Sequence, residues 1–311
     1  LNNPLVSILY HNQAIDLNLI LETLTNKNSY DILIVLDGLN NIYDQKNIQK
    51  KFKNLQIIPN KKIGISKCRN LSIDFAINNK KDLLIFLDSD AVPSNQFFLD
   101  HLDNHNFFPE FPIQGGPIIP TFLQNHLKKK NYFSKIDGMM SWFVMMRENK
   151  PSLIKKPLHI PTLNMSLRID ILKKYDIRFN EKLKTGEDID FCEKFRSKNF
   201  KIFKNIKPTV DHSDRQGFKE VLKHQISWGR HQYYTVFKKR FNKFGVVFKV
   251  GFLILFPFFL FLYSFLTSLI VIVPWIKKKI SYLLDFPLIY LLSLIKALYC
   301  YLEFIDEIKK K

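Results

Sequence analysis

An uninterrupted apolar run ends in two carboxylates, one residue apart, at Leu83-Leu84-Ile85-Phe86-Leu87-Asp88-Ser89-Asp90. The run does not alternate with polar residues, so it predicts a parallel strand that is covered on both faces. Ligands of open α/β sheets collect beyond the carboxyl ends of such strands, so we expect Asp88 and Asp90 at a binding site. Hard divalent cations such as Mg²⁺ and Mn²⁺ bind carboxylate oxygens together with substrate phosphates and water. The motif therefore predicts a metal site that suits a diphosphate leaving group.

Three further segments support a functional interpretation of this motif. An Asp-x-Asp tripeptide also arises by chance and then often begins a surface turn. Here, however, Gly64–Asn70 leads into a predicted amphipathic helix over residues 71–77, Gly186-Glu187-Asp188 begins another helical pattern, and Val210-Asp211-His212 follows. The presence of all four elements in this order favours one functional site over a chance tripeptide.

The residues predict how a nucleoside diphosphate would leave a sugar carbon. Departure concentrates negative charge on the phosphate oxygens, and a bound divalent ion stabilises that charge. We expect Asp90 to bind the metal, and Asp88 either to share the ion or to hold the ribose. His212 is predicted either to bind the metal as a further ligand or to contact a metal ligand without binding the metal itself. A single histidine more often has a structural role.

Transfer to an acceptor also needs a general base, because the attacking hydroxyl loses its proton opposite the leaving group. Asp188 fits this role, since an ordinary Asp has a pKa of about 3.9 and is ionised at neutral pH. The adjacent Glu187 points in a different direction at the start of a helix, so it either caps the helix or contacts the acceptor. Arg69 offers a planar fork for phosphate oxygens, or pairs with Asp37 or Asp74.

Taken together, these segments resemble the inverting nucleotide-sugar glycosyltransferases of family two, which have the GT-A fold. The matching segments, within residues 5–235, are Val6–Leu9, Ile32–Gly38, Gly64–Asn70, Asp88–Asp90, Asn164-Met165, Gly186–Asp188, Arg196 and Val210–His212. The resemblance implies the α/β class, with a GT-A Rossmann-like mixed sheet flanked by helices. It also implies metal-dependent, inverting transfer from a nucleotide diphosphate sugar, with Mn²⁺ or Mg²⁺ as the cofactor.

The resemblance also implies two groups of substrate contacts. The residues expected to bind the nucleotide sugar are Asp37, Arg69, Asp88 and Ser89. Those expected to bind the sugar or the acceptor are Asn164, Glu187, Trp228 and Arg230. Where the family often has two Asp residues after the second strand, this chain has Leu36-Asp37, which leaves the nucleotide open. Residues 225–230 resemble but do not match the Gln-x-x-Arg-Trp signature of processive synthases, which favours transfer of a single sugar.

Composition predicts three regions in the 311 residues: a transferase domain over 1–215, a basic amphipathic connecting helix over 216–245, and a membrane-embedded or interfacial region over 246–311. Residues 250–275 carry no charge and are long enough to cross a bilayer as a helix. Residues 282–302 contain Asp285 and Lys296, so they form either a second span or an interfacial helix. The cost of burying charge in lipid favours the interfacial helix.

Charge predicts an anionic membrane as a partner. The formal net charge is +19, and residues 216–311 hold 15 Lys and Arg against 5 Asp and Glu. These basic residues flank apolar segments and accompany no nucleic-acid motif, so we expect anionic lipid and no nucleic acid. More of them precede the long apolar run than follow it, which predicts a catalytic domain on the cytoplasmic side. An acceptor that is a lipid-linked glycan or a polyprenyl phosphate would fit a site tethered beside the bilayer.

Two other classes of protein remain open at this stage. The sequence Asp88-Ser89-Asp90-Ala91-Val92 also suits the nucleophile loop of haloacid-dehalogenase-type phosphatases, in which the first Asp is phosphorylated. That loop usually opens its domain, whereas here two predicted strands come first. A non-catalytic membrane adaptor with a degenerate transferase domain is the third alternative.

Overall fold

The computed structural model describes residues 1, 3–10, 17–25, 30–38, 49–50, 52, 54–59, 61, 63–124, 131–156, 158–183 and 185–309. The chain divides into two compact units. Unit 1 comprises Leu1–Ile119 and Met145–Ser213, and unit 2 comprises Pro120–Val144 and Asp214–Lys311. The domain predicted over residues 1–215 therefore differs from unit 1 at Pro120–Val144, which packs with the C-terminal helices.

Unit 1 is built around a mixed sheet of eight strands within the described residues. In spatial order the strands are β3 (Leu55–Ile58), β2 (Asp31–Leu36), β1 (Pro4–Tyr10), β4 (Leu83–Asp88), β9 (Met165–Arg168), β6 (Ile113–Gly115), β10 (Ile202–Lys204) and β8 (Ser152–Leu153). Its helices are α1 (Leu17–Thr25), α3 (Ile65–Asn78), α4 (Phe97–Phe107), the 3₁₀ turn η2 (Thr162–Asn164), α6 (Ile169–Tyr175) and α7 (Glu187–Ser197). The predicted α/β class, a mixed sheet flanked by helices, is confirmed.

Strand β4 lies where the sheet changes from parallel to antiparallel pairing. It runs parallel to β1, with Leu9 opposite Asp88, and antiparallel to β9, with Ile85 opposite Ser166. All five apolar residues of the predicted strand are buried, as expected for a strand that is covered on both faces. The prediction of a parallel strand is thus confirmed on the β1 side only.

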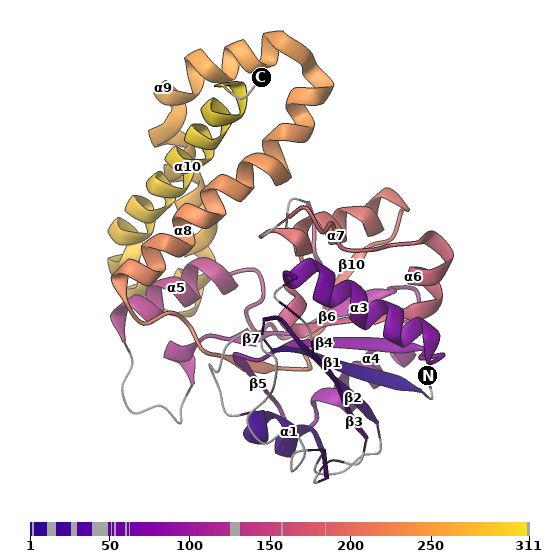
Figure 1. The fold of residues 1–311 in the computed structure, drawn as a ribbon. Coiled ribbons are helices and arrows are strands. Elements are labelled where there is room, and N and C mark those ends of the chain that lie inside the picture. The colour runs from indigo at the N-terminus through magenta and orange to yellow at the C-terminus, as the bar shows by residue number, and fades with distance from the viewer. Residues whose placement is uncertain are drawn as a thin grey trace. The chain divides into compact units, whose positions relative to one another are not determined.

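A smaller sheet begins just beyond the carboxyl end of β4. Within the described residues it contains, in order, β5 (Ala91–Pro93), β11 (Val210–His212) and β7 (Ile118–Ile119). His212 lies opposite Ala91 in the antiparallel pair of β11 and β5, so the pairing places His212 next to the Asp-x-Asp motif. On the large sheet, α3 packs against β1, β2 and β4 (Figure 1).

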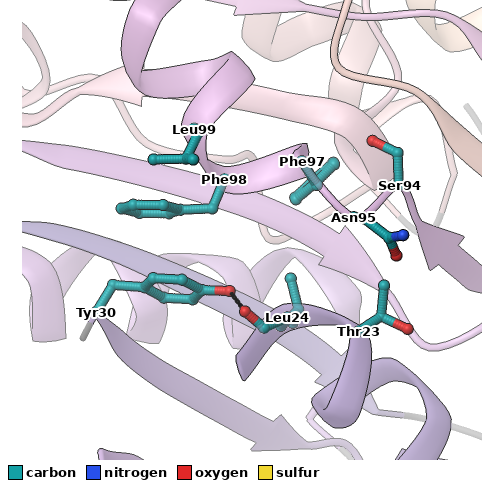
Figure 2. A pocket seen from close by; sticks show the side chains of 8 residues that line it. All are labelled: Thr23, Leu24, Tyr30, Ser94, Asn95, Phe97, Phe98 and Leu99. Carbon is teal, nitrogen blue, oxygen red and sulfur yellow. Dashed lines mark hydrogen bonds between the residues drawn. The ribbon is translucent and has the colours of Figure 1, made fainter. Parts of the chain in front are cut away.

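A small hollow in unit 1 is lined by residues of α1 and α4 and of the segments beside them (Figure 2). The Tyr30 hydroxyl donates a hydrogen bond to the Leu24 carbonyl, and the Tyr30 ring stacks on Phe98 with the ring centres 3.9 Å apart. The hollow has a volume of about 10 Å³, which is close to that of a single water probe. The hollow is therefore a packing defect and not a substrate site.

Unit 2 is helical in its described residues. Its elements are the 3₁₀ turn η1 (Thr121–Leu123), α5 (Tyr132–Trp142), α8 (Phe218–Gln232), the π-helix η3 (Tyr233–Phe237), α9 (Lys238–Lys278), the 3₁₀ turn η4 (Ile280–Asp285) and α10 (Phe286–Lys309). Buried Asp214 joins the two parts of unit 2, Pro120–Val144 and Asp214–Lys311. Its carboxylate accepts hydrogen bonds from the Trp142 indole at 2.8 Å and from the Thr121 amide at 2.7 Å. These bonds, together with packing of α5 on α8, explain why residues 120–144 belong to unit 2.

The long helices of unit 2 pack against one another. Helices α8 and α10 run side by side and in parallel (Figure 1), since Gly229 meets Lys296 and Lys238 meets Glu307. Helix α9 contains a non-helical residue at Gly245, where φ is +70°. Within the described residues, Gly245–Lys278 and Ile280–Lys309 are long and apolar enough to cross a membrane.

Candidate active site

The site begins with the turn that precedes α3. The Asp37 carboxylate at the end of β2 accepts hydrogen bonds from the amides of Ile63 and Gly64, at 2.8 and 3.0 Å. Gly64 has a φ of +96°, a conformation that favours glycine, and α3 begins at the next residue. Asp37 therefore holds the start of α3 in place, and its predicted contact with the nucleotide stays a prediction.

Arg69, in the second turn of α3, joins the two carboxylate motifs. Its side chain is 4% exposed, and its guanidinium donates one hydrogen bond to Glu187 and another, 3.3 Å long, to Asp88. Glu187 begins α7 and Asp88 ends β4, so the two motifs meet at one arginine. The predicted alternative partners of Arg69 are not the ones observed, since Asp74 pairs with Arg178.

Burial decides the electrostatics of this cluster. It raises the pKa of Glu187, and the Asp188 charge adds to the rise, whereas Arg69 opposes it. Burial also raises the pKa of Asp88, with Arg69 again opposing and the neighbouring Asp90 adding to the rise. For Arg69, burial works to lower the pKa, but the carboxylates outweigh burial and raise it. The arginine stays charged and is held by two carboxylates that burial would otherwise tend to neutralise.

Asp188 lies beside this cluster in a different environment. One carboxylate oxygen accepts a hydrogen bond from the Ile189 amide at 2.8 Å, and the other lies 3.2 Å from Nε2 of His159. Burial alone would raise the pKa of Asp188, but His159, Arg69 and the Ile189 amide together lower it below its ordinary value. Asp188 is therefore held ionised, which is the state that a general base needs.

His159 was not among the residues predicted from the sequence. It lies 29 positions before Asp188, in the loop ahead of η2, and the pairing of these two residues arises only in the folded chain. No spacing or periodicity connects a loop histidine to the start of a distant helix. Only a motif that named both residues could have identified the pair.

Asp90 and His212 meet where β11 pairs with the start of β5. Nε2 of His212 lies 3.5 Å from the Asp90 carboxylate, and the Ser213 amide donates to the Asp90 carbonyl. Across the described residues, no three His, Cys, Asp or Glu side chains gather closely enough to hold a metal ion by themselves. Asp88 and Asp90 nevertheless place two oxygen donors at one strand end, and Mg²⁺ and Mn²⁺ often bind one or two carboxylates with phosphates and water. The donor set fits such an ion, and metal binding by these residues stays a prediction.

Two other predicted residues of unit 1 lie in the interior. Asn164 is fully buried, where its amide donates to the carbonyls of Pro117 and Pro208 and its oxygen lies 3.1 Å from His101. Ser89 is also buried, and its amide donates to the Leu9 carbonyl at 3.3 Å. Asn164 thus joins the segments that contain Pro117 and Pro208, and Ser89 fixes the backbone of the Asp-x-Asp motif to β1. The predicted contacts of both residues with substrate stay predictions.

The remaining predicted residues, Trp228 and Arg230, belong to α8 in unit 2. The Trp228 ring packs on His224 with the ring centres 4.1 Å apart, and the Lys296 ammonium lies 4.9 Å from its centre. Arg230 is half exposed and pairs with Glu303 of α10 at 3.9 Å. Within unit 2 these two residues contribute to the contact between α8 and α10, and their predicted role toward an acceptor stays a prediction.

The fold is similar to solved structures of S. aureus TarS. The fragment of residues 1–349 in complex with UDP-GlcNAc superposes with a TM-score of 0.50 at 15% identity, over 99% of this chain and 92% of that chain. The same fragment in complex with UDP gives a TM-score of 0.49 at 14% identity, with the same coverage. No protein-family model and no curated protein sequence matches the chain. The similarity shows the fold, and the function has to be argued from the site.

Proposed function

We propose that the chain is a metal-dependent inverting glycosyltransferase that moves a single sugar from a nucleotide diphosphate sugar to a hydroxyl of a membrane-associated acceptor. The observation that carries this proposal is the arginine bridge. Arg69 binds Asp88 and Glu187 at the same time, which supports a single site that contains the Asp-x-Asp motif and the base candidate Asp188. A phosphate-side group and a proton acceptor within one site are what sugar transfer requires.

In the proposed reaction, an acceptor oxygen forms a bond to the anomeric carbon while the bond from that carbon to the phosphate oxygen breaks. The hydroxyl proton goes to the Asp188 carboxylate, and the bonding electron pair leaves with the nucleoside diphosphate. His159 and the Ile189 amide hold Asp188 ionised before this transfer. A divalent ion held by Asp88 and Asp90 would neutralise charge on the diphosphate when bound.

UDP-GlcNAc is the first donor to test, because the TarS fragment of similar fold binds it. The experiment incubates the intact chain with UDP-GlcNAc and other nucleotide sugars, with Mn²⁺ and vesicles that carry membrane lipids, and measures nucleoside diphosphate release. We expect release with at least one donor and a loss of about 10²-fold or more in Asp188→Asn, in line with removal of a general base. Asp176→Asn is the matched control, since Asp176 is exposed at the end of α6. Equal rates in both variants would remove Asp188 from the mechanism.

A second experiment tests the metal. Binding to the folded state raises apparent stability, so a nucleoside diphosphate is expected to raise the unfolding temperature in the presence of Mn²⁺ and much less with a chelator. Asp90→Asn should abolish this dependence on Mn²⁺. Stabilisation of equal size without metal would contradict metal binding at Asp88 and Asp90.

The same assays separate the two alternatives. Phosphate release from a phosphomonoester, with no nucleotide sugar present, would favour a phosphatase with Asp88 as its nucleophile. Lipid binding without any turnover of nucleotide sugars would favour the non-catalytic adaptor.

A further inference from the structure

Helix α9 has two different faces beyond Gly245. One face packs inside unit 2, where Phe252, Phe256, Ile272 and Trp275 are buried. Most of the remaining helix surface, called here the outer face of α9, is exposed. It includes residues that are 41% to 79% exposed: Val250, Ile254, Leu255, Phe258, Phe259, Phe261, Leu262, Phe265, Leu266, Ile270 and Val273. Every one of them is apolar, and they extend for about 36 Å along the helix. Soluble proteins rarely leave so large an apolar patch uncovered, so the outer face has a partner.

Both ends of α9 are held by polar contacts within unit 2. At the C-terminal end, Trp275 is fully buried and its indole donates to the Met139 carbonyl of α5 at 3.0 Å. Beside it, the Lys135 ammonium of α5 lies 2.5 Å from the Asp285 carboxylate. At the other end, the Lys238 ammonium lies 3.1 Å from the Glu307 carboxylate of α10. These contacts tie both ends of the helix to one compact unit.

Helix α8 provides an argument against a crossing of the bilayer by α9 and α10. It packs closely along α10, since a Cβ placed on Gly229 would lie 2.3 Å from the Lys296 carbonyl oxygen. It also exposes charged residues, which are Lys219, Glu220 and Lys223. If α9 and α10 crossed the membrane, α8 would enter the hydrocarbon alongside them, and its charges would be buried in lipid at high cost.

The charges around the outer face identify its partner. Lys249 precedes the outer face, and the exposed residues Lys277, Lys278 and Lys279 follow it. The sequence contains no Asp or Glu between Glu220 and Asp285. A second copy of the chain, docked symmetrically on this face, would bring lysines together with no carboxylate from this segment to pair with them. Anionic lipid headgroups supply the missing negative charge, and acyl chains cover the apolar residues.

We infer that α9 docks its outer face on the surface of an anionic bilayer and lies along the membrane plane without crossing it. This arrangement differs from the crossing predicted for residues 250–275. It is independent of the proposed sugar transfer, because binding and topology are measured without any nucleotide sugar.

Vesicle flotation tests the docking surface. The intact chain is expected to float with phosphatidylcholine vesicles that contain 30% phosphatidylglycerol, and to bind pure phosphatidylcholine at least ten-fold more weakly. Phe258→Glu, at a residue that is 79% exposed on the outer face, should weaken binding at least ten-fold. Phe107→Glu is the matched control, because Phe107 is 76% exposed in unit 1. Equal binding of the two variants would overturn the proposal, as would a soluble dimer, seen by light scattering, that Phe258→Glu dissociates.

Labelling from one side of the vesicle distinguishes docking from crossing. Val246→Cys and Ile280→Cys place a thiol at either end of the α9 segment, at positions that are each 71% exposed. Protein added to preformed vesicles is treated with a membrane-impermeant maleimide, and the buried native cysteines of the unaltered chain give the background. We expect both positions to react to within two-fold of each other. Reaction at one position only, with the other reacting after detergent is added, would show a crossing helix and refute the proposal.

Discussion

Replacing Arg69 by Met tests the arginine bridge directly. The substitution keeps an unbranched side chain of similar length but removes the guanidinium that Asp88 and Glu187 share. Both carboxylates then lose their buried cation, and Glu187 remains almost fully shielded from water because its side chain is 10% exposed. Breaking a buried ion pair by removing one partner typically destabilises a protein by about 3–5 kcal/mol.

The expected loss lies near the lower end of that range. Asp88 is 28% exposed, so water recovers part of its solvation when Arg69 is removed. A loss of about 3 kcal/mol lowers the unfolding temperature of a unit of this size by roughly 6–12 °C. Arg178→Met is the matched control, because Arg178 pairs with Asp74 near the surface, where such a pair contributes about 1 kcal/mol or less.

The dependence of this stability loss on pH tests whether the loss is electrostatic. Arg69 opposes the rise in the pKa of Glu187, so its removal raises that pKa further above the unfolded value. A group whose folded pKa is raised contributes stability at low pH and loses it as the pH rises through the folded pKa. The loss of unfolding free energy in Arg69→Met relative to the unaltered chain, measured by calorimetry, should therefore be smaller at pH 5 than at pH 7.5. A deficit that is equal at both pH values, or no larger than that of Arg178→Met, would refute the electrostatic explanation.

Three shorter predictions concern other parts of the chain. Burial lowers the pKa of His105 to about 3, so stability is lost as the pH falls below the ordinary value of 6.5. Between pH 7.5 and 5.5 the loss is about 1.4 kcal/mol, and urea unfolding of His105→Gln should show a correspondingly smaller change. His159→Gln should raise the pKa of Asp188, so the acidic limb of a pH–rate profile moves to higher pH; an unmoved limb would contradict the contact between these residues. Gly229→Ala should destabilise unit 2, because its new methyl group would overlap the Lys296 carbonyl; unchanged thermal unfolding would contradict the close packing of α8 on α10.

The sequence predicted those parts of the fold that depend on local pattern. The apolar run at residues 83–87 is buried in β4, and the helix expected over residues 71–77 is part of α3. Packing between distant segments was not predictable in the same way. The segment Pro120–Val144 joins unit 2 through Asp214, and a single buried carboxylate leaves no periodic signal in a sequence.

The candidate site shows the same division. Arg69, Asp88 and Glu187 were recognised as separate candidates, because each follows a strand or begins a helix in a recognisable pattern. The bridge between them depends on which of several nearby carboxylates the folded chain brings to α3, and the expected partners Asp37 and Asp74 are used elsewhere. For α9, apolar residues all around the helix concealed which face would be buried.

Glu187 and Asp188 are chemically similar neighbours, yet the structure gives them opposite protonation behaviour. Burial raises the pKa of Glu187 despite the hydrogen bond from Arg69. For Asp188, burial is outweighed by His159, Arg69 and the Ile189 amide, so its pKa is lowered. Where two titratable groups in one site are driven apart in this way, the ionised member is suited to accept a proton and the other to hold position. This separation supports the proposed role of Asp188 as the base, and it leaves Glu187 to anchor Arg69. Glu187→Gln should therefore weaken the fold around Arg69. The acidic limb of the pH–rate profile should still follow the ionisation of Asp188.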